Sequence, residues 1–302
     1  MRRTRGADPH DLIWVMPAQG RRKATGVSWR APPAQVAHPL CLRLYALPSA
    51  GGFFLSAAGV RCTGVRLDYP GLPTLDGVDL EVAPGEFVAL IGPSGCGKST
   101  LLRCIAGLER PDAGAILPAP VVGRAALMPQ NDCLLPWRNL LDNVALGPEL
   151  SGAKGPRRQA LEGLRAFGLQ DFAAAYPAAL SGGMRQRAAL LRTTLAGKPL
   201  LLLDEPLGAL DSLTRIELQS WLEALWLSGG AGRPSVLLVT HDVAEAVYLA
   251  DRVLVFSPRP ARLVAAIAVP APRARPADFR TSDQAVALQA QLLAALAGGA
   301  VA

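Results

Sequence analysis

The sequence predicts an α/β fold built around a mostly parallel β-sheet, and three observations predict it. The continuous apolar run Phe87–Ile91 leads through a glycine-rich loop into a segment with helical spacing. The runs Leu200–Leu203 and Val236–Val239 are also continuously apolar and bounded by polar residues, which is typical of strands buried on both faces of a parallel sheet. Because helical segments separate these runs, strands and helices alternate as they do in parallel α/β folds.

The N-terminal half of the fold is predicted from turns and short apolar runs. Val60–Tyr69 and Leu80–Val82 have the pattern of strands in an antiparallel edge, and Pro84-Gly85 is the turn that follows them. After the glycine-rich loop, a helix is expected over Ser99–Ala106 and a strand over Ala125–Met128.

The C-terminal half is predicted to contain several helices. Leu161, Leu164 and Phe167 fall on one helical face, and Ser181 has the position of an N-cap, with Gly197 as the matching C-cap. The predicted helices are Arg157–Phe167, Ser181–Ala196, Ile216–Leu227 and Ser282–Ala297, and a further strand is expected at Val253–Phe256.

We expect one domain over residues 58–302. Residues 1–57 are rich in Arg, Pro, Gly and Ala without a sustained period, and they are expected to be a disordered extension or the product of a start placed too far upstream. Within the domain, a helical subdomain is expected at about residues 131–196 and a C-terminal tail at about 258–302.

The net charge of +7 comes entirely from the N-terminal segment. Residues 1–61 contain nine basic and two acidic residues, and the remaining 22 basic and 22 acidic residues cancel. A neutral domain argues against a nucleic-acid partner. No run of about 18 uninterrupted apolar residues occurs, so a membrane role would require a partner. Five cysteines without a C-x-x-C pair are expected neither to bind zinc nor to form a disulfide framework, which fits a reducing cytoplasm.

The glycine-rich loop has the pattern G-x-x-x-x-G-K-S and predicts a phosphate-binding site. In such a loop, backbone N–H groups wrap the phosphates, Lys98 reaches the β and γ oxygens, and the Ser99 hydroxyl holds Mg²⁺. The N-terminus of the following helix adds partial positive charge. The predicted nucleotide-binding residues of the loop are Gly92, Pro93, Ser94, Gly95, Cys96, Gly97, Lys98, Ser99 and Thr100.

An acidic pair, Asp204 and Glu205, ends the apolar run that begins at Leu200. Ligands of open α/β sheets bind at the carboxyl ends of the strands, so this pair is expected beside the phosphate loop. There Asp204 could hold Mg²⁺ and Glu205 could polarise an attacking water. Taken alone, the pair could equally be a solvated strand end.

A second anion site is predicted at the turn Ser181-Gly182-Gly183. A serine cap followed by two glycines leaves N–H groups free at a helix start, although such a turn on its own is often an ordinary loop. Because the first loop already holds the nucleotide, the second site would serve best on another subunit.

These motifs together resemble those of the ATPase subunit of an ABC transporter. The family's order is kept by the phosphate loop at 92–99, LSGGMRQR at 180–187, LLLLDEP at 200–206, LGALD at 207–211 and His241. The resemblance covers about residues 59–300 and implies a P-loop NTPase fold with a RecA-like sheet, an antiparallel β edge and a helical subdomain.

The resemblance also implies roles for single residues. Tyr69 matches the aromatic residue that stacks on adenine, and Gln130 matches the glutamine that contacts Mg²⁺ and the attacking water. Glu205 matches the general base, and His241 matches the switch histidine that bonds the γ-phosphate. The remaining matches concern the dimer: Ser181 and Gly183 contact the ATP of the other subunit, and Asp211 lines the seam.

The mechanism that the resemblance implies uses two copies that meet head to tail around two ATP molecules. Hydrolysis opens this homodimer and passes the motion to transmembrane permease subunits. An extracellular or periplasmic solute-binding protein delivers the solute to these subunits. The chain would then lie peripherally on the cytoplasmic face of the cell inner membrane, with ATP and Mg²⁺ as cofactors.

A narrower resemblance concerns residues 128–144. Met128-Pro-Gln130 and the following Leu-Leu-Pro-Trp137 are similar to the nitrate/sulfonate/taurine importer branch, and importers of thiamine-precursor pyrimidines share much of this pattern. Leu134, Leu135 and Trp137 are expected to form a groove for the permease, or else to pack within the helical subdomain.

Three other functions remain as alternatives. A soluble ABC ATPase that acts on nucleic acid or ribosomes usually carries two cassettes or long insertions, and neither occurs here. A GTPase-like switch would need an N-K-x-D motif, which is absent. A catalytically dead scaffold would not need both Glu205 and His241.

Overall fold

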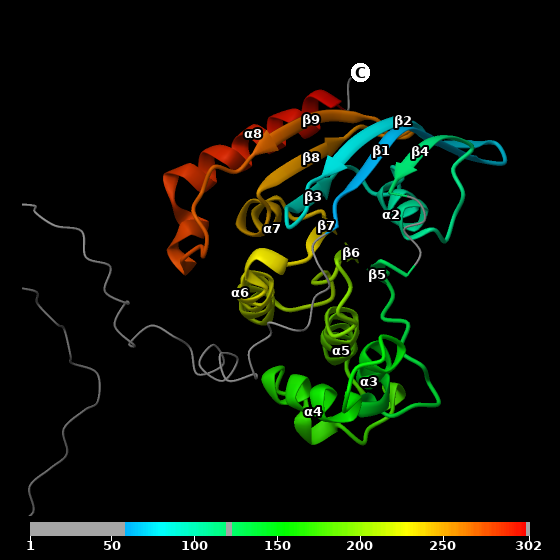
Figure 1. The fold of residues 1–302 in the computed structure, drawn as a ribbon. Helices are drawn as coiled ribbons and strands as arrows, with labels where there is room; N and C mark the ends of the chain where they lie inside the picture. The colour runs from blue at the N-terminus through cyan, green and yellow to red at the C-terminus, as the bar shows by residue number, and fades with distance from the viewer. Residues whose placement is uncertain (1–57, 119–122, 300–302) are drawn as a thin grey trace, which may run out of the picture. The chain divides into compact units, whose positions relative to one another are not determined.

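The computed structural model describes residues 58–118 and 123–299 (Figure 1). The predicted N-terminal extension, residues 1–57, lies outside the described residues. The strands are β1 (Val60–Tyr69), β2 (Leu72–Val82), β3 (Phe87–Ile91), β4 (Ala113–Leu117), β5 (Ala125–Met128), β6 (Leu200–Asp204), β7 (Ser235–Val239), β8 (Arg252–Phe256) and β9 (Leu263–Ala268). The helices are α2 (Lys98–Ala106), α3 (Leu140–Leu150), α4 (Pro156–Ala166), α5 (Gly182–Thr194), α6 (Ser212–Ser228), α7 (Val243–Leu249) and α8 (Asp283–Gly299).

The central sheet has six strands in the order β5-β6-β7-β3-β8-β9. All neighbouring pairs are parallel except β8 with β9, which is antiparallel. Every residue of β3, β6 and β7 is buried, as expected for strands covered on both faces. The predicted α/β fold with a mostly parallel sheet is therefore confirmed.

The predicted antiparallel edge is a separate sheet of three strands in the order β2-β1-β4. Strand β2 begins at Leu72, earlier than the predicted Leu80, because it forms a hairpin in which Tyr69 pairs with Leu72. The turn between them contains Gly71 with φ of 72°, a conformation that glycine adopts without strain.

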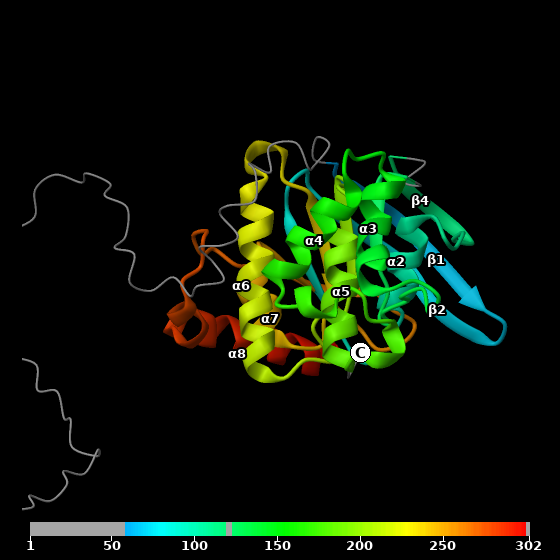
Figure 2. The same cartoon turned by 90° about the horizontal axis from the view of Figure 1, so that it is seen from below.

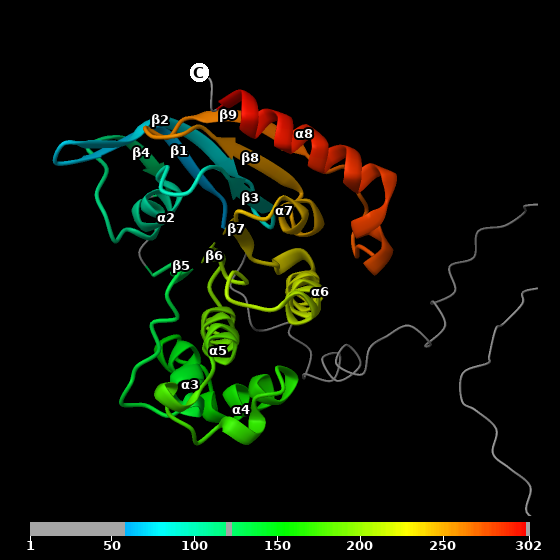
Figure 3. The same ribbon diagram turned by 180° about the vertical axis from the view of Figure 1, so that it is seen from behind.

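Alternate residues of the central strands point into two different hydrophobic clusters. Val88 and Leu90 of β3 pack with α2 and the β1–β2 hairpin, whereas Phe87, Ala89 and Ile91 pack with α5, α6, α7 and α8. The sheet is thus covered on both faces, and the view from behind shows α2 and α7 on its two sides (Figure 3). Helices α3, α4 and α5 lie together in all three views (Figure 2).

Several helices and strands differ from the prediction. Strand β9, which lies within the Pro- and Arg-rich stretch of residues 258–276, was not predicted because an edge strand with a mixed burial pattern has no continuous apolar run. Helix α7 was missed because seven residues are too few to show a period. Helix α3 contains Pro148 and was also missed, since proline inside a helix is unfavourable. Helix α5 ends with Leu195 as its C-cap, and the predicted cap Gly197 follows in the left-handed conformation, with φ of 63°.

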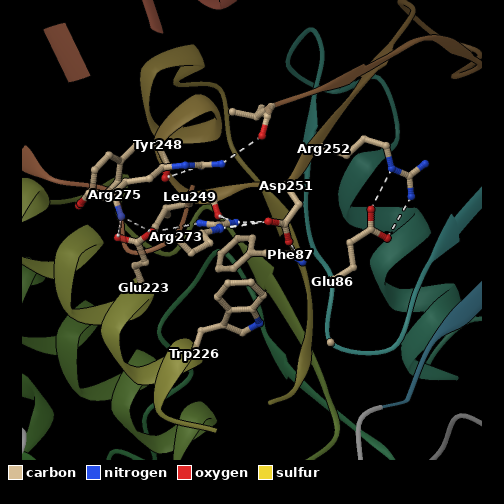
Figure 4. A network of polar contacts seen from close by, with 12 residues as sticks. Glu86, Phe87, Glu223, Trp226, Tyr248, Leu249, Asp251, Arg252, Arg273 and Arg275 are labelled. Carbon is tan, nitrogen blue, oxygen red and sulfur yellow. Dashed lines mark hydrogen bonds and ion pairs between the residues drawn. The ribbon is translucent and has the colours of Figure 1, made fainter. Parts of the chain in front are cut away.

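A buried ionic network fixes the segment that precedes α8 (Figure 4). The guanidinium of Arg273 donates to Asp251 at 2.8 and 3.0 Å and to Glu223 of α6 at 3.2 Å. It also lies 4.6 Å from the centroid of the Trp226 ring. The backbone N–H of Arg275 donates to the same Glu223 carboxylate. Because Arg273 bridges Asp251 and Glu223, removing it would leave the buried Glu223 carboxylate without its charged partner.

This network lies at the amino ends of the parallel strands. Asp251 accepts the N–H of Phe87, the first residue of β3, at 2.9 Å, and Arg252, the first residue of β8, pairs with Glu86. The pKa of Arg275 is lowered to about 10, mainly by burial and further by the nearby positive charge of Arg273. The carboxyl ends of the same strands are left for ligands.

Candidate active site

The carboxyl ends of β3, β7 and β6 bring the predicted catalytic loops together. The N–H of Thr240, directly after β7, donates to Leu90 of β3 at 3.2 Å. The N–H of Glu205, directly after β6, donates to Val239 of β7 at 2.9 Å. The phosphate loop, the acidic pair and the His241 turn are therefore neighbours at one edge of the sheet.

Two glycines of the phosphate loop lie so close to neighbouring strands that a side chain would fit only if its neighbours shifted. A Cβ atom on Gly97, whose φ is 125°, would lie 3.0 Å from both Leu75 and the carbonyl oxygen of Thr74. A Cβ atom on Gly92 would lie 3.0 Å from Phe256. The loop therefore packs directly against β2 and β8, which fixes its path.

The Lys98 side chain folds back over this loop. It is 6% exposed, and its ammonium donates to the carbonyl oxygens of Gly92 and Pro93, each at 2.8 Å. The N-cap of α2 is Gly97, which offers no side-chain acceptor, so the first N–H groups of the helix have no capping partner. A buried ammonium beside uncapped helix N–H groups is the arrangement that binds phosphate.

Asp204 lies below the phosphate loop and is buried. Burial raises the pKa of its carboxyl group, the hydrogen bond with Ser99 lowers it, and the neighbouring Glu205 raises it further. The pair Asp204–Ser99 offers only oxygen ligands, which are those that Mg²⁺ prefers. The described residues contain no group of three or more His, Cys, Asp or Glu side chains suited to a metal ion.

Glu205 is held between two polar side chains. Gln130 donates from Nε2 to Glu205 Oε2 at 3.3 Å, and Nδ1 of His241 lies 3.5 Å from Glu205 Oε1. Glu205 has φ of 48°, which is unusual for a residue other than glycine. Its carbonyl oxygen accepts from Gln186 at 3.1 Å and from the N–H of Gly208 at 3.2 Å, and these bonds hold the turn in this conformation.

Tyr69 is joined to the helix that follows the phosphate loop. Its hydroxyl donates to Glu109 at 2.5 Å and accepts from Arg103 at 3.2 Å. Arg103 also donates to Thr100, the third residue of α2, at 3.2 Å. The tyrosine hydroxyl is therefore held by a residue in the second half of α2 and by one in the segment that follows it.

The predicted second anion site forms a separate surface. Ser181 caps α5 by accepting the N–H of Met184, and Asp211 caps α6 by accepting the N–H of Thr214. Gly182 and Ser181 are exposed, and a Cβ atom on Gly183 would lie 3.2 Å from Leu210, so the two caps are neighbours. Within residues 58–118 and 123–299, no hydrogen bond or ion pair joins either cap to the phosphate loop.

Sequence reasoning missed several residues that support these loops. Arg185 joins the loop after Gln130 to the turn before Ser181, since it donates to Asp132 at 2.9 Å and to the carbonyl oxygen of Leu180 at 2.7 Å. Arg259, from the loop after β8, donates to the carbonyl oxygen of Gly95 at 3.0 Å. The contacts of Arg185 with Asp132 and of Arg259 with Gly95 have no local sequence signal, because each joins residues far apart in the chain.

The apolar residues after Gln130 are divided between core and surface. Leu134 is buried and Leu135 is half-buried, whereas 72% of Trp137 is exposed.

No helix in the described part of the chain has the length and apolarity needed to cross a membrane.

Comparisons with known proteins agree with this geometry. Residues 75–208 match the family model described as ABC transporter. The chain is 48% identical over 235 residues to the aliphatic sulfonates import ATP-binding protein SsuB of Pseudomonas putida, covering 76% of this chain and 83% of that protein. It is 52% identical over 224 residues to the SsuB of Ralstonia nicotianae, covering 72% and 76%.

Solved structures give the same result. The dimeric post-hydrolysis structure of the ATP-binding cassette MJ0796 bound to ADP and Pi has a TM-score of 0.63 and 29% identity, covering 70% of this chain and 99% of that one. Together these matches confirm the predicted resemblance to the nitrate/sulfonate/taurine branch. The chain belongs to the ATP-hydrolysing subunits of ABC transporters.

Proposed function

We propose that this chain powers the uptake of aliphatic sulfonates by hydrolysing ATP on the cytoplasmic face of the inner membrane, where it binds a separate permease. The observation that carries the proposal is the carboxylate of Glu205, which is held between Gln130 and His241 beside the phosphate loop. That arrangement suits a general base for water attack on a terminal phosphate.

Each residue of the site has a defined task in this reaction. Lys98 neutralises phosphate charge, and the N–H groups at the start of α2 bind phosphate oxygens. Ser99, Asp204 and Gln130 would hold Mg²⁺, which supplies charge neutralisation on the phosphates when bound. Glu205 accepts the proton of the attacking water, and His241 reaches the same carboxylate from the adjacent strand end.

The Ser181 and Asp211 caps are proposed to act on a second copy of the chain. Ser181 and Gly182 are exposed at the start of α5, where the N-terminus of a helix attracts phosphate. A head-to-tail homodimer would place Ser181, Gly182 and Gly183 on the ATP held by the other copy. The dimeric MJ0796 structures support this arrangement.

The permease is proposed to contact the surface around Trp137. The indole of Trp137 is 72% exposed, and tryptophan is enriched in protein–protein interfaces relative to the rest of the surface. It lies within the proposed helical subdomain at about residues 131–196, in the loop that carries Gln130. A permease segment seated there would sense the state of the nucleotide site through this loop.

The solute follows from the relatives alone. Both relatives described above are named as importers of aliphatic sulfonates, which favours that solute over thiamine-precursor pyrimidines and over a soluble role without transport. The solute is selected outside this chain, by the binding protein and the permease.

The test is uptake of an isotopically labelled alkanesulfonate in cells that lack their own sulfonate ATPase and carry the cognate permease. We expect uptake with the natural chain and none with Lys98→Ala. Uptake of a pyrimidine precursor instead would contradict the proposed solute while leaving the ATPase intact.

A further inference from the structure

The turn that carries His241 is closed by a ring of hydrogen bonds. The Thr240 hydroxyl donates to Oε2 of Glu245 at 2.7 Å and accepts the N–H of Asp242 at 3.0 Å. Asp242 Oδ1 in turn accepts the N–H of Glu245 at 3.1 Å. The ring therefore joins the residues on both sides of His241, whose own side chain is 60% exposed.

Glu245 is the least expected member of this ring. It is 4% exposed, and its second oxygen, Oε1, is buried without a hydrogen-bond partner among the described residues. A buried carboxyl group with an unpartnered oxygen destabilises a fold. A residue that only filled space here would be better apolar.

The connection to hydrolysis is short. Thr240 is bonded to β3 through Leu90, and the preceding residue, Val239, accepts the N–H of Glu205. The His241 turn thus begins between the phosphate loop and the general base. Any shift of the turn changes the 3.5 Å separation between His241 and Glu205.

Resting on the ATPase function proposed above, we propose that Glu245 is a positioning residue for hydrolysis, whose carboxyl group holds the His241 turn against Glu205 through Thr240. It touches neither nucleotide nor the attacking water. Its oxygen acts as the acceptor that orients the Thr240 hydroxyl, and this hydroxyl sets the path of the chain through His241.

The charges that face Glu245 come from three directions. Asp242 from its own turn and Glu205 from the end of β6 oppose its ionisation, and Arg215 from α6 favours it. Burial is the largest influence, and the pKa of Glu245 is raised to about 7. Ionisation strengthens the bond from Thr240 because a charged acceptor binds a hydroxyl more tightly. The hold on the turn therefore tightens as the pH rises through about 7.

The test compares ATP hydrolysis by the full chain and its variants from about pH 5.5 to about pH 9. Thr240→Val keeps the shape and removes the hydroxyl, and Glu245→Ala removes the acceptor. Both should lower kcat roughly 10- to 100-fold and leave KM within about twofold, since a small misplacement affects chemistry more than binding. Glu245→Gln keeps an acceptor, so it should restore most of kcat while losing the increase through pH 7.

Two controls accompany these variants. Thr193→Val removes a buried hydroxyl that bonds only within α5, and Glu149→Gln neutralises an exposed carboxylate of α3. Both should keep the natural kcat and pH profile. A natural kcat in Thr240→Val, or a Glu245→Gln variant as slow as Glu245→Ala, would overturn the proposal.

A readout without turnover separates this proposal from the ATPase function. Hydrogen exchange at the Asp242 N–H, which donates to the Thr240 hydroxyl, reports the ring and should be faster in Glu245→Ala than in the natural chain. Unchanged exchange would overturn the role of Glu245 even if the chain hydrolyses ATP. Faster exchange in a chain without ATPase activity would support the ring and contradict the proposed function instead.

Discussion

Nδ1 of His241 lies 3.5 Å from Oε1 of Glu205, although the two residues follow different strands of the sheet. Gln130 approaches the other oxygen of the same carboxylate at 3.3 Å. The Glu205 carboxylate is thus contacted on both oxygens by side chains from the loops that follow β5 and β7.

Glu205→Gln should keep nucleotide binding and lose turnover. The amide retains the shape of the side chain and one of its two acceptor oxygens but cannot accept a proton from water, so kcat should fall roughly 10²- to 10⁴-fold. Phosphate release measures this effect, with the exposed Glu149→Gln as the control. Turnover at the natural rate would require another base.

Lys98→Ala should weaken ATP binding. Loss of a charge-assisted hydrogen bond to phosphate corresponds to about 1.5–3 kcal/mol, or roughly 10- to 150-fold in Kd. Equilibrium binding of a fluorescent ATP analogue measures the loss, and Lys154→Ala, which removes an exposed lysine elsewhere, should bind normally. Equal affinity of the two variants would contradict the assignment of the phosphate loop.

Tyr69 should contribute its ring rather than its hydroxyl to ATP affinity. Tyr69→Phe gives up the bonds to Glu109 and Arg103 but keeps a stacking surface, so its Kd should stay close to the natural value. Tyr69→Ala should lose about 1–3 kcal/mol of stacking. Titration with ATP and with inorganic triphosphate distinguishes the cases, since triphosphate should bind both variants alike. An equal loss for the two ligands would rule out base stacking.

Trp137→Ala should uncouple the chain from its permease without affecting ATP hydrolysis by the free chain. The indole is largely exposed and takes no part in the phosphate site. Co-purification with the permease should fall, whereas Leu150→Ala, which alters a residue that is 78% exposed, should leave it intact. Normal assembly of Trp137→Ala would remove this surface from the proposed contact.

Glu245 should make stability depend on pH. Its pKa is about 7 in the folded chain, against 4.5 for an ordinary glutamate in water, so the folded state binds the proton more tightly than the unfolded state. Stability should therefore fall as the pH rises between these two values, by roughly 1–3 kcal/mol. Melting temperatures at about pH 5 and pH 8 should differ less in Glu245→Gln than in the natural chain. If the melting temperatures of the two proteins changed equally with pH, Glu245 would not be the source of the pH dependence.

The central sheet was predictable because its strands are continuous apolar runs with polar ends. Leu200–Leu203 and Val236–Val239 were placed within one residue of β6 and β7. The ends of β3 and β6 then located the phosphate loop and the acidic pair, since parallel strands share one functional edge.

The parts that were missed depend on contacts between distant residues. Strand β9 exists because its backbone pairs with β8, and its own pattern is only partly apolar. The left-handed conformation of Glu205 depends on bonds from Gln186 and Gly208, and no local motif for it was identified. Thr240 and Glu245 are only five residues apart, and their bond was missed because α7, with seven residues, is too short to show a helical period.

The central claim is that ATP is bound between the phosphate loop of one copy and the Ser181 turn of another. Light scattering of the full chain carrying Glu205→Gln, with ATP and Mg²⁺, tests it most directly. The account predicts twice the monomer mass with ATP and the monomer mass with ADP. Adding Ser181→Arg should abolish the dimer, and Ser228→Arg, at the far end of α6, should not. A monomer in ATP, or a dimer that survives Ser181→Arg, would contradict the account.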